Sequence, residues 1–318
     1  MEKKVATREA YGKALLEFGK DERIVVLDAD LSKSTKTDLF KNEYPDRFFN
    51  MGIAEANMMS YAAGLATCGK IVFASTFAIF AAGRGYEQIR NSIAYPNLNV
   101  KIGASHAGIS VGEDGASHQA IEDIALMTAI PNMTVLSPCD EVETRHAVKA
   151  AIEHDGPVYI RLGRLGVPKI FDEDNYEFKL GKGITIKEGT DVTIISTGLM
   201  TSYALLASEI LANKNISARV INMHTLKPID EEIIIKAAKE TKALVTVEEH
   251  NVIGGLGSLV AAVTSSKYPV PIKMVGVMDK FGKSGNPNEL LEKYGLTEQN
   301  IVNKVEEVIK LKGEYYGR

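Results

Sequence analysis

Residues 98–163 decide the fold, and they read LNVKIGASHAGISVGEDGASHQAIEDIALMTAIPNMTVLSPCDEVETRHAVKAAIEHDGPVYIRLG. Three short apolar runs in this stretch have the composition of strands that are buried on both faces, and two longer segments between them have the patterning of helices. The predicted strands are 98–104, 133–137 and 158–163, and the predicted helices are 118–130 and 141–154. Strands that alternate with helices in this way predict a parallel sheet with helices on both faces.

The same alternation extends from this stretch toward both ends of the chain. Tyr11, Ala14, Leu15 and Phe18 recur with the spacing of an amphipathic helix, and IVVLD (24–28) has the composition of a buried strand. The remaining predicted elements are helices at 35–42, 54–67, 79–94, 201–213, 230–240 and 255–266, strands at 71–75, 191–196, 217–223, 243–249 and 271–277, and two short helices near the C-terminal end.

One segment breaks this rhythm. Residues 166–190 contain Pro168, an acidic run and three glycines (181, 183 and 189), a composition that is typical of an inter-domain linker. We therefore predict an α/β protein with two doubly wound, mostly parallel sheets: a first domain over 1–170, a linker over 171–190 and a smaller second domain over 191–318.

Composition and charge exclude several classes of protein. The chain has 318 residues, of which 45% are apolar and 25% charged, as in ordinary globular proteins. Its net charge of −4 argues against a general nucleic-acid or anionic-membrane surface. Cys68 and Cys139 form no zinc or disulfide pattern, and the sequence has neither an apolar signal core at its start nor a run of 18 apolar residues. We expect a cytoplasmic protein that binds no nucleic acid and no membrane.

The most unusual segment is GASHAGISVGEDGASHQA (103–120), which follows a predicted strand. It brings together His106, Glu113, Asp114 and His118 among several glycines, at the edge where doubly wound sheets bind ligands. Two readings are open: a glycine-rich turn whose end caps a helix, or a polar pocket for a phosphorylated or polyhydroxylated substrate. The histidine spacing fits no zinc geometry, so we predict no metal ligands in this chain.

Glu55 is the only acidic residue between Phe48 and Thr67. A glutamate in the first turn of a helix is favoured by the helix dipole alone. The alternative is a buried carboxyl group among Ala, Met and Ile side chains that shares a proton with a ligand nitrogen. The sequence leaves both readings open.

Aromatic and basic residues make further candidates. Phe77 and Phe80 are three residues apart, a spacing that is typical of a core, and Arg84 and Arg90 have the character of surface or interface groups.

Basic side chains also lie next to predicted strands. Arg161 and Arg164 follow a strand and suit either a salt bridge or a phosphate, and Arg8 and Ser34 are equally ambiguous. GGLG (254–257) resembles part of a dinucleotide fingerprint, but Val260 stands where the third glycine belongs.

Taken in chain order, these segments resemble the C-terminal half of transketolases, which are thiamine-diphosphate enzymes, over nearly the whole chain. The motifs that carry the resemblance are ATREAYGKAL, DADLSKST, PDRFFNMGIAEANM, ASTFAIF, GASHAGISVGEDGASHQAIEDIA, YIRLGR, INMHTLKPID, VEEHNVIGGLG and KSGNPNELLEKYGL. The resemblance implies that the first domain binds the pyrimidine of the cofactor and that the second is the transketolase C-terminal domain.

The resemblance also implies roles around the cofactor. Glu55 matches the catalytic acid that hydrogen-bonds the ring nitrogen of the aminopyrimidine, and Phe77 and Phe80 match aromatic residues that pack on this ring. Asp30 matches an acidic residue near the cofactor. Some members have a third aromatic residue shortly after the second, whereas this chain has Ala81, Ala82 and Gly83 there.

Substrate roles follow from the same resemblance. His106 and His118 match pocket histidines that bind hydroxyl groups and move protons, and His118 stands where some relatives have glutamine. Asp114 matches the acid that contacts the C2 hydroxyl of the substrate. The residues that match the binding group for the substrate phosphate are Arg8, Ser34 and Arg164. A ketose phosphate such as xylulose 5-phosphate would donate a two-carbon ketol unit to an aldose phosphate such as ribose 5-phosphate.

The chain lacks the GDG motif with which the family holds Mg²⁺ and the diphosphate. The resemblance therefore implies one subunit of a split transketolase, whose N-terminal partner subunit supplies these ligands, and a heterotetramer of two copies of each chain. The rivals are the β subunit of a 2-oxoacid dehydrogenase, a deoxyxylulose-phosphate synthase, a non-catalytic regulatory subunit with the same fold and, on the incomplete GGLG alone, a nicotinamide enzyme.

Overall fold

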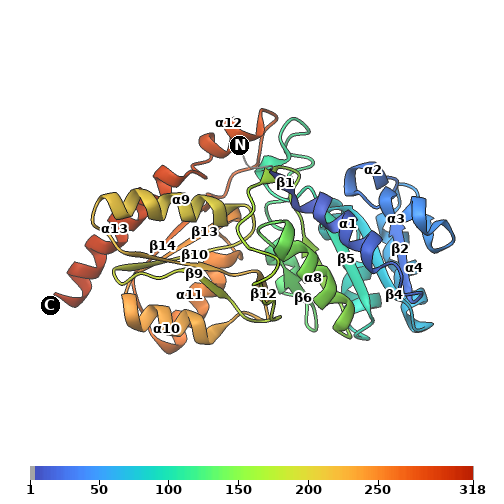
Figure 1. Cartoon of the computed structure of the whole chain (residues 1–318), viewed down its shortest axis with the longest axis horizontal. Coiled ribbons are helices and arrows are strands. Elements are labelled where there is room, and N and C mark those ends of the chain that lie inside the picture. Colours follow the sequence, from blue (N-terminus) through green and yellow to red (C-terminus); the bar gives the residue numbers. More distant parts are fainter. Residues whose placement is uncertain (1–3, 318) are drawn as a thin grey trace.

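The structure is a computed structural model that describes residues 4–317. Two β-sheets lie side by side along the long axis of the molecule, each flanked by helices (Figure 1). All neighbouring strands of the two sheets are parallel except for one antiparallel strand at an edge of each sheet. The predicted α/β fold with two mostly parallel sheets is confirmed.

The first sheet has seven strands. In spatial order they are β12 (Thr225–Lys227), β6 (Thr134–Leu136), β7 (Val158–Arg161), β5 (Val100–Ser105), β4 (Ile71–Phe77), β2 (Ile24–Asp28) and β3 (Phe48–Asn50). A separate antiparallel pair joins β1 (Val5–Ala6) to β8 (Gly166–Val167).

The second sheet has five strands. In spatial order they are β14 (Ile272–Val277), β13 (Leu244–Asn251), β10 (Val192–Ser196), β11 (Ala218–Asn222) and β9 (Ile184–Lys187). Strand β9 lies within the segment predicted as the linker and pairs antiparallel with β11.

Strand β2 shows why the central strands are apolar throughout. Ile24 and Val26 pack into the core on the face covered by α1 (Thr7–Phe18), α3 (Asp38–Glu43) and α8 (Glu141–Glu153). Val25 and Leu27 pack into the core on the opposite face. Because successive strand side chains point to opposite faces, a strand between two helix layers must be apolar at nearly every position.

The opposite face of the first sheet has a core that continues into the second sheet. The helices that contribute to it are α4 (Glu55–Thr67), α5 (Ala78–Arg84), α7 (Asp123–Thr128), α10 (Glu231–Thr241) and α11 (Leu256–Lys267). The other face of the second sheet is covered by α9 (Met200–Asn213) and α13 (Glu298–Tyr316), and α12 (Pro287–Lys293) precedes α13 (Figure 1).

Strand β12 ties the two halves together. It follows β11 of the second sheet in the chain, yet it pairs with β6 at the edge of the first sheet. Its last residue, Lys227, donates through Nζ to the carbonyls of Thr128 and Ile130 at the end of α7. The sheets are therefore not two independent units.

Two predicted helices are shorter or broken in the structure. The helix predicted over 118–130 is wrong in its first five residues, because helix α7 begins only at Asp123. The residues before it form a loop with turns at Gly112 and Gly115, both at positive φ. The helix predicted over 79–94 is divided at Gly85 into α5, the short α6 (Tyr86–Gln88) and the π-helical turn η2 (Ile89–Ala94).

Two further helix predictions need correction. The helix predicted over 35–42 is two short helices, α2 (Ser32–Thr35) and α3, because Lys36 between them has a left-handed φ of 68°. Only one of the two predicted C-terminal helices is short, since α13 has 19 residues. Single-turn 3₁₀ helices at η1 (Pro45–Arg47) and η3 (Ile109–Val111) complete the elements.

Candidate active site

The carboxyl ends of the parallel strands bring most of the predicted site residues to one edge of the first sheet. Phe77 is the last residue of β4, and His106 follows the last residue of β5. Arg164 lies three residues beyond β7, and Ser34 lies in α2, which follows β2. This is the edge at which doubly wound sheets bind ligands.

Four rings pack together at this edge. The rings of Phe77 and Phe80 are nearly parallel, at 14°, with centroids 5.8 Å apart. His106 stacks on Phe77 at 3.8 Å, and His118 meets Phe80 edge-on at 5.3 Å. The two phenylalanines therefore form part of a site wall together with both histidines, rather than packing only within the core.

His106 is held in a defined protonation state. Its Nε2 lies 3.3 Å from Nη1 of Arg8, and its Nδ1 lies 3.0 Å from Oγ of Ser105. A guanidinium only donates, so Nε2 accepts and the ring proton is on Nδ1. Burial lowers the pKa of His106 to about 3, and the positive charges of Arg8 and Arg164 add to this shift. The imidazole is neutral across the physiological range.

Glu55 is buried at the first turn of α4 and contacts a cation. Its two carboxylate oxygens each lie 3.3 Å from Nη1 of Arg84, and Oγ1 of Thr76 lies 3.5 Å from Oε1. The same guanidinium lies over the ring of Phe80, 4.1 Å from the centroid. Arg84 lies at the surface, as expected, with its side chain half exposed, and it covers both the carboxylate and an aromatic face.

A second basic group lies beyond His106. Arg8 also donates to the carbonyl of Ser34 at 2.8 Å, and its buried Nε has no hydrogen-bond partner among the described residues. Arg164 donates to the carbonyl of Val111 and, at 2.9 Å, to Oε2 of Glu113. These two guanidinium groups provide the donors that an oxyanion needs.

The structure does not join every predicted residue to this cluster. Asp30 is exposed and accepts a hydrogen bond from Nδ2 of Asn50 at 2.7 Å. Asp114 is exposed in the loop before α7. Within residues 4–317, neither carboxylate makes a hydrogen bond or ion pair to Glu55, the four rings or the two arginines.

The sequence reasoning missed the buried acids behind the site. Oδ2 of Asp123 accepts from Tyr159 and from Nε of Arg161, both at 2.9 Å, and all three side chains are buried. Asp28 is also buried, and its carboxylate accepts from Thr35 at 2.7 Å. A signal was available for Asp28, because an acid at the end of an apolar strand must find buried donors.

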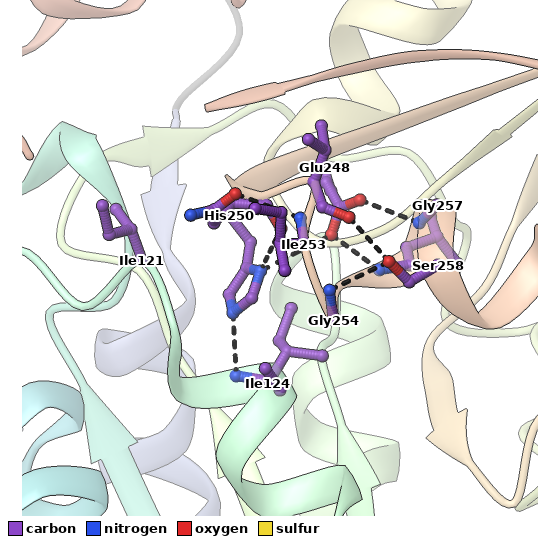
Figure 2. Close-up of polar contacts among 12 residues, drawn as sticks. Ile121, Ile124, Glu248, His250, Ile253, Gly254, Gly257 and Ser258 are labelled. Atoms are coloured by element: carbon purple, nitrogen blue, oxygen red, sulfur yellow. Dashed lines mark hydrogen bonds and ion pairs between the residues drawn. The ribbon is translucent and has the colours of Figure 1, made fainter. Parts of the chain in front are cut away.

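The GGLG motif does not leave the start of α11 free for a dinucleotide. Figure 2 shows Glu248 beside the start of α11, where its carboxylate accepts from the amides of Leu256 at 2.6 Å and Gly257 at 2.8 Å. A diphosphate would meet this buried carboxylate instead of free amides. The nicotinamide alternative is therefore not supported.

Two kinds of feature are absent from residues 4–317. No group of three or more His, Cys, Asp or Glu side chains is arranged to hold a metal ion. Among the described helices, none combines the length and the apolar character that a membrane span needs.

Comparison with known proteins gives the family. Residues 3–169 match the transketolase pyrimidine-binding domain, and residues 181–301 match the transketolase C-terminal domain. A protein of Methanocaldococcus jannaschii that is named as a transketolase C-terminal section is 52% identical over 306 residues, which are 95% of this chain and 96% of that protein. The 6-deoxy-6-sulfo-D-fructose transketolase subunit of Clostridium sp. (strain MSTE9) is 46% identical over 96% of this chain and 95% of its own length.

A solved structure agrees with these matches. A split-gene transketolase, described as an inactive β4 tetramer, superposes with a TM-score of 0.91 at 59% identity, over 97% of this chain and 99% of that one. The resemblance noted in the sequence is thus confirmed. The chain belongs to the transketolase family, of which it carries the pyrimidine-binding and C-terminal domains.

Proposed function

We propose that this chain is the C-terminal subunit of a split transketolase that transfers a two-carbon ketol unit between sugar phosphates. The observation that carries the proposal is the buried Glu55 carboxylate beside the parallel rings of Phe77 and Phe80, with His106 stacked behind them. Family membership supports a dependence on thiamine diphosphate.

The residues at the sheet edge fit the aminopyrimidine of this cofactor. The planar guanidinium of Arg84 lies over Phe80 and against Glu55, and this arrangement of a flat nitrogen donor supports the proposal. When bound, thiamine diphosphate supplies the nucleophilic carbon that carries the ketol unit. Glu55 would then release Arg84 and bind the ring nitrogen of the aminopyrimidine, where it would hold a proton at that nitrogen.

The substrate would lie between the histidines and the arginines. Neutral His106 would offer Nε2 to a substrate hydroxyl once Arg8, which donates to that atom here, turns to the substrate phosphate, and His118 extends the same wall. Arg8 and Arg164, together with Ser34, would bind the substrate phosphate. Asp114 would contact the C2 hydroxyl of the substrate, and Asp30 would assist at the cofactor.

We infer that the metal and diphosphate ligands come from a partner chain. The sequence lacks the GDG motif, and residues 4–317 hold no metal-binding cluster. An N-terminal transketolase subunit would supply Mg²⁺ and diphosphate ligands within an α2β2 heterotetramer. The inactive state named for the related β4 tetramer supports this requirement.

The sugars are proposed by class. Xylulose 5-phosphate and ribose 5-phosphate are the first pair to test, because the two arginines suit a terminal phosphate. The sulfofructose activity in the name of the Clostridium relative makes a sulfonated ketose the second pair.

The testing experiment is purification of the tagged chain together with co-purifying proteins, followed by an assay of ketol transfer. We expect transfer from xylulose 5-phosphate to ribose 5-phosphate that depends on thiamine diphosphate, on Mg²⁺ and on a co-purifying chain. A decarboxylation without ketol transfer would instead favour a 2-oxoacid or deoxyxylulose enzyme. A complex with no response to the cofactor would overturn the proposal.

A further inference from the structure

The loop that carries both site histidines has little regular structure of its own. This histidine loop, residues 106–122, is closed at its base, where the amide of Gly108 donates to the carbonyl of Ala120 at 2.8 Å. Between these points it has only the single turn η3. Its first residue, His106, has a left-handed φ of 57°, which is unfavourable for a residue with a side chain. Other parts of the molecule must therefore fix its shape.

The second sheet supplies a buried carboxylate to the back of this loop. Oε1 of Glu249, in β13, accepts a hydrogen bond from the backbone amide of Ser110 at 2.5 Å. Glu249 is only 4% exposed. A Cβ atom placed on Gly108 would lie 2.3 Å from the carboxyl carbon of Glu249, at a φ of +83°. The loop backbone and this carboxylate thus fit closely, and only glycine is tolerated between them.

Arg161, at the end of β7 in the first sheet, forms hydrogen bonds to β13, the strand that carries Glu249. Its Nη2 donates to the carbonyl of Glu249 at 2.9 Å and to that of Ala120 at 3.3 Å. Its Nε donates to Asp123 at the start of α7. One buried guanidinium therefore joins the end of β7, the base of the histidine loop and strand β13.

The far half of the loop is also held from the second half of the chain. Nε2 of Gln119 donates to the carbonyl of Lys283 at 2.9 Å, and Oγ of Ser284 donates to the carbonyl of Glu113 at 2.5 Å. Beyond the loop, the amide of Ile124 donates to Nε2 of His250 at 3.1 Å (Figure 2). The loop therefore presents its histidines toward the site while its back is fixed by the C-terminal domain.

We propose that Glu249 is a positioning residue for substrate binding, which acts from the C-terminal domain by fixing the Ser110 turn of the histidine loop. The inference rests on the proposed function, since it is the sugar phosphate that the positioned His106 and His118 contact. The Glu249 carboxylate is buried against the Ser110 amide and is not among the proposed binding groups, so its loss would loosen the histidines without removing any of those groups.

The strand offers a matched control. Glu248 is the neighbouring residue, is equally buried and also accepts backbone amides, but its carboxylate holds the start of α11 instead of the histidine loop. Glu249→Ala and Glu248→Ala therefore remove the same group from adjacent positions on opposite faces of β13. Glu249→Gln retains an acceptor oxygen for Ser110.

The first measurement is hydrogen–deuterium exchange on the full chain. We expect Glu249→Ala to speed exchange of the segment 108–112 by about tenfold or more, because a buried hydrogen bond is lost. Glu249→Gln should stay close to wild type. Glu248→Ala should speed exchange at 256–257 and leave 108–112 unchanged. Unchanged exchange in 108–112 for Glu249→Ala would overturn the attachment.

The second measurement uses the complex with the partner chain. Glu249→Ala should raise KM for the ketose phosphate by about tenfold or more, while the Kd for thiamine diphosphate stays within about twofold. Glu249→Gln should largely restore KM, and Glu248→Ala should keep it. Faster exchange with an unchanged KM would show that the contact is only structural and would overturn the positioning role.

A substitute variant and the wild-type complex keep this inference distinguishable from the proposed function. If Glu249→Ala does not fold, Gly108→Ala takes its place, because its Cβ displaces the carboxylate while Glu249 remains. A wild-type complex without ketol transfer would overturn the proposed function and the substrate part of this inference. The exchange pattern would still decide whether Glu249 fixes the loop.

Discussion

At the scale of single residues, the proposed chemistry depends on Glu55 and its contact with Arg84. The carboxylate is buried, whereas the guanidinium is half exposed and is free to leave toward solvent. Water can solvate the half-exposed Arg84 when it leaves, and a ligand that hydrogen-bonds Glu55 would keep the buried carboxylate paired.

The first prediction concerns Glu55. Glu55→Gln keeps the shape of the side chain but cannot supply the proton, so kcat for ketol transfer should fall by about 100-fold or more. Glu209→Gln, on the exposed face of α9, is the matched control and should keep full activity. Circular dichroism and melting curves should be the same for all three proteins. Full activity of Glu55→Gln in the complex would refute the role given to this carboxyl group.

The second prediction concerns Arg84. Arg84→Ala removes a group that competes for Glu55 and Phe80, so the complex should bind thiamine diphosphate about three- to tenfold more tightly. Calorimetric titration of the complex measures this Kd. Arg90→Ala, whose guanidinium contacts Asn91 instead, is the control. Weaker binding by Arg84→Ala would show that Arg84 contacts the cofactor rather than competing with it.

At this scale the sequence predicted that His106, directly after a strand, lies at the edge of the sheet. The roles given to Glu55, Phe77 and Phe80 came from the family resemblance, because their spacing alone indicated a core or a helix start. It could not predict Arg84, because the contact to Glu55 joins residues on two helices whose packing is set only by the folded sheet. Asp123 and Glu249 were missed for the same reason, since their partners are far away in the chain. The proposed roles of Asp30 and Asp114 stay predictions.

At the scale of elements, strands were predicted better than the segments between them. An apolar run of β-branched residues is buried wherever it lies, so β2 and β4 follow from composition alone. The histidine loop was predicted in part as helix, because its polar residues match a helical period. Its real shape depends on buried hydrogen bonds to β13, which no local pattern records.

The third prediction tests two glycines in different elements. Gly255→Ala would place a Cβ 1.9 Å from Oε2 of Glu248, so the carboxylate must leave the start of α11. The free energy of unfolding should fall by about 1–3 kcal/mol, the cost of an unsatisfied buried group. Gly64→Ala lies mid-helix in α4 with nothing within 4 Å of the new Cβ. It should raise stability by about 0.5–1 kcal/mol.

Urea denaturation of the isolated chain measures both values. Since the two substitutions add the same atom, opposite signs would show that local space decides the result. A stabilised Gly255→Ala would mean that Glu248 does not hold the helix start.

At the scale of the whole molecule, buried groups join the two halves. Glu143 of α8 accepts from Tyr176 at 2.6 Å and from Asn222 of β11 at 2.7 Å. His224, just before β12, is fully buried against the ring of Phe178 at 4.2 Å. These contacts make the arrangement of the sheets a part of the fold and not a matter of a flexible linker.

The fourth prediction uses His224 to test this joint. Burial lowers the pKa of His224 to about 4, below its usual 6.5, so the unfolded chain binds the proton first. The stability that the neutral ring provides is present above pH 6.5 and is lost as the pH falls toward 4. His224→Gln should therefore lose less unfolding free energy than wild type between pH 7 and 4.5. Urea denaturation at both pH values measures this loss. If wild type and His224→Gln lost the same unfolding free energy, the His224 ring would not be buried in solution.

Strand β12 restricts how a gene for this protein can be divided. A coding sequence cut at the predicted linker would place β12 and β6 on different polypeptides. The bare edge of β6 would then offer its backbone to any other strand, and the product would tend to aggregate. Evolution can separate the two domains only after another segment has covered that edge. Until then they must be inherited together.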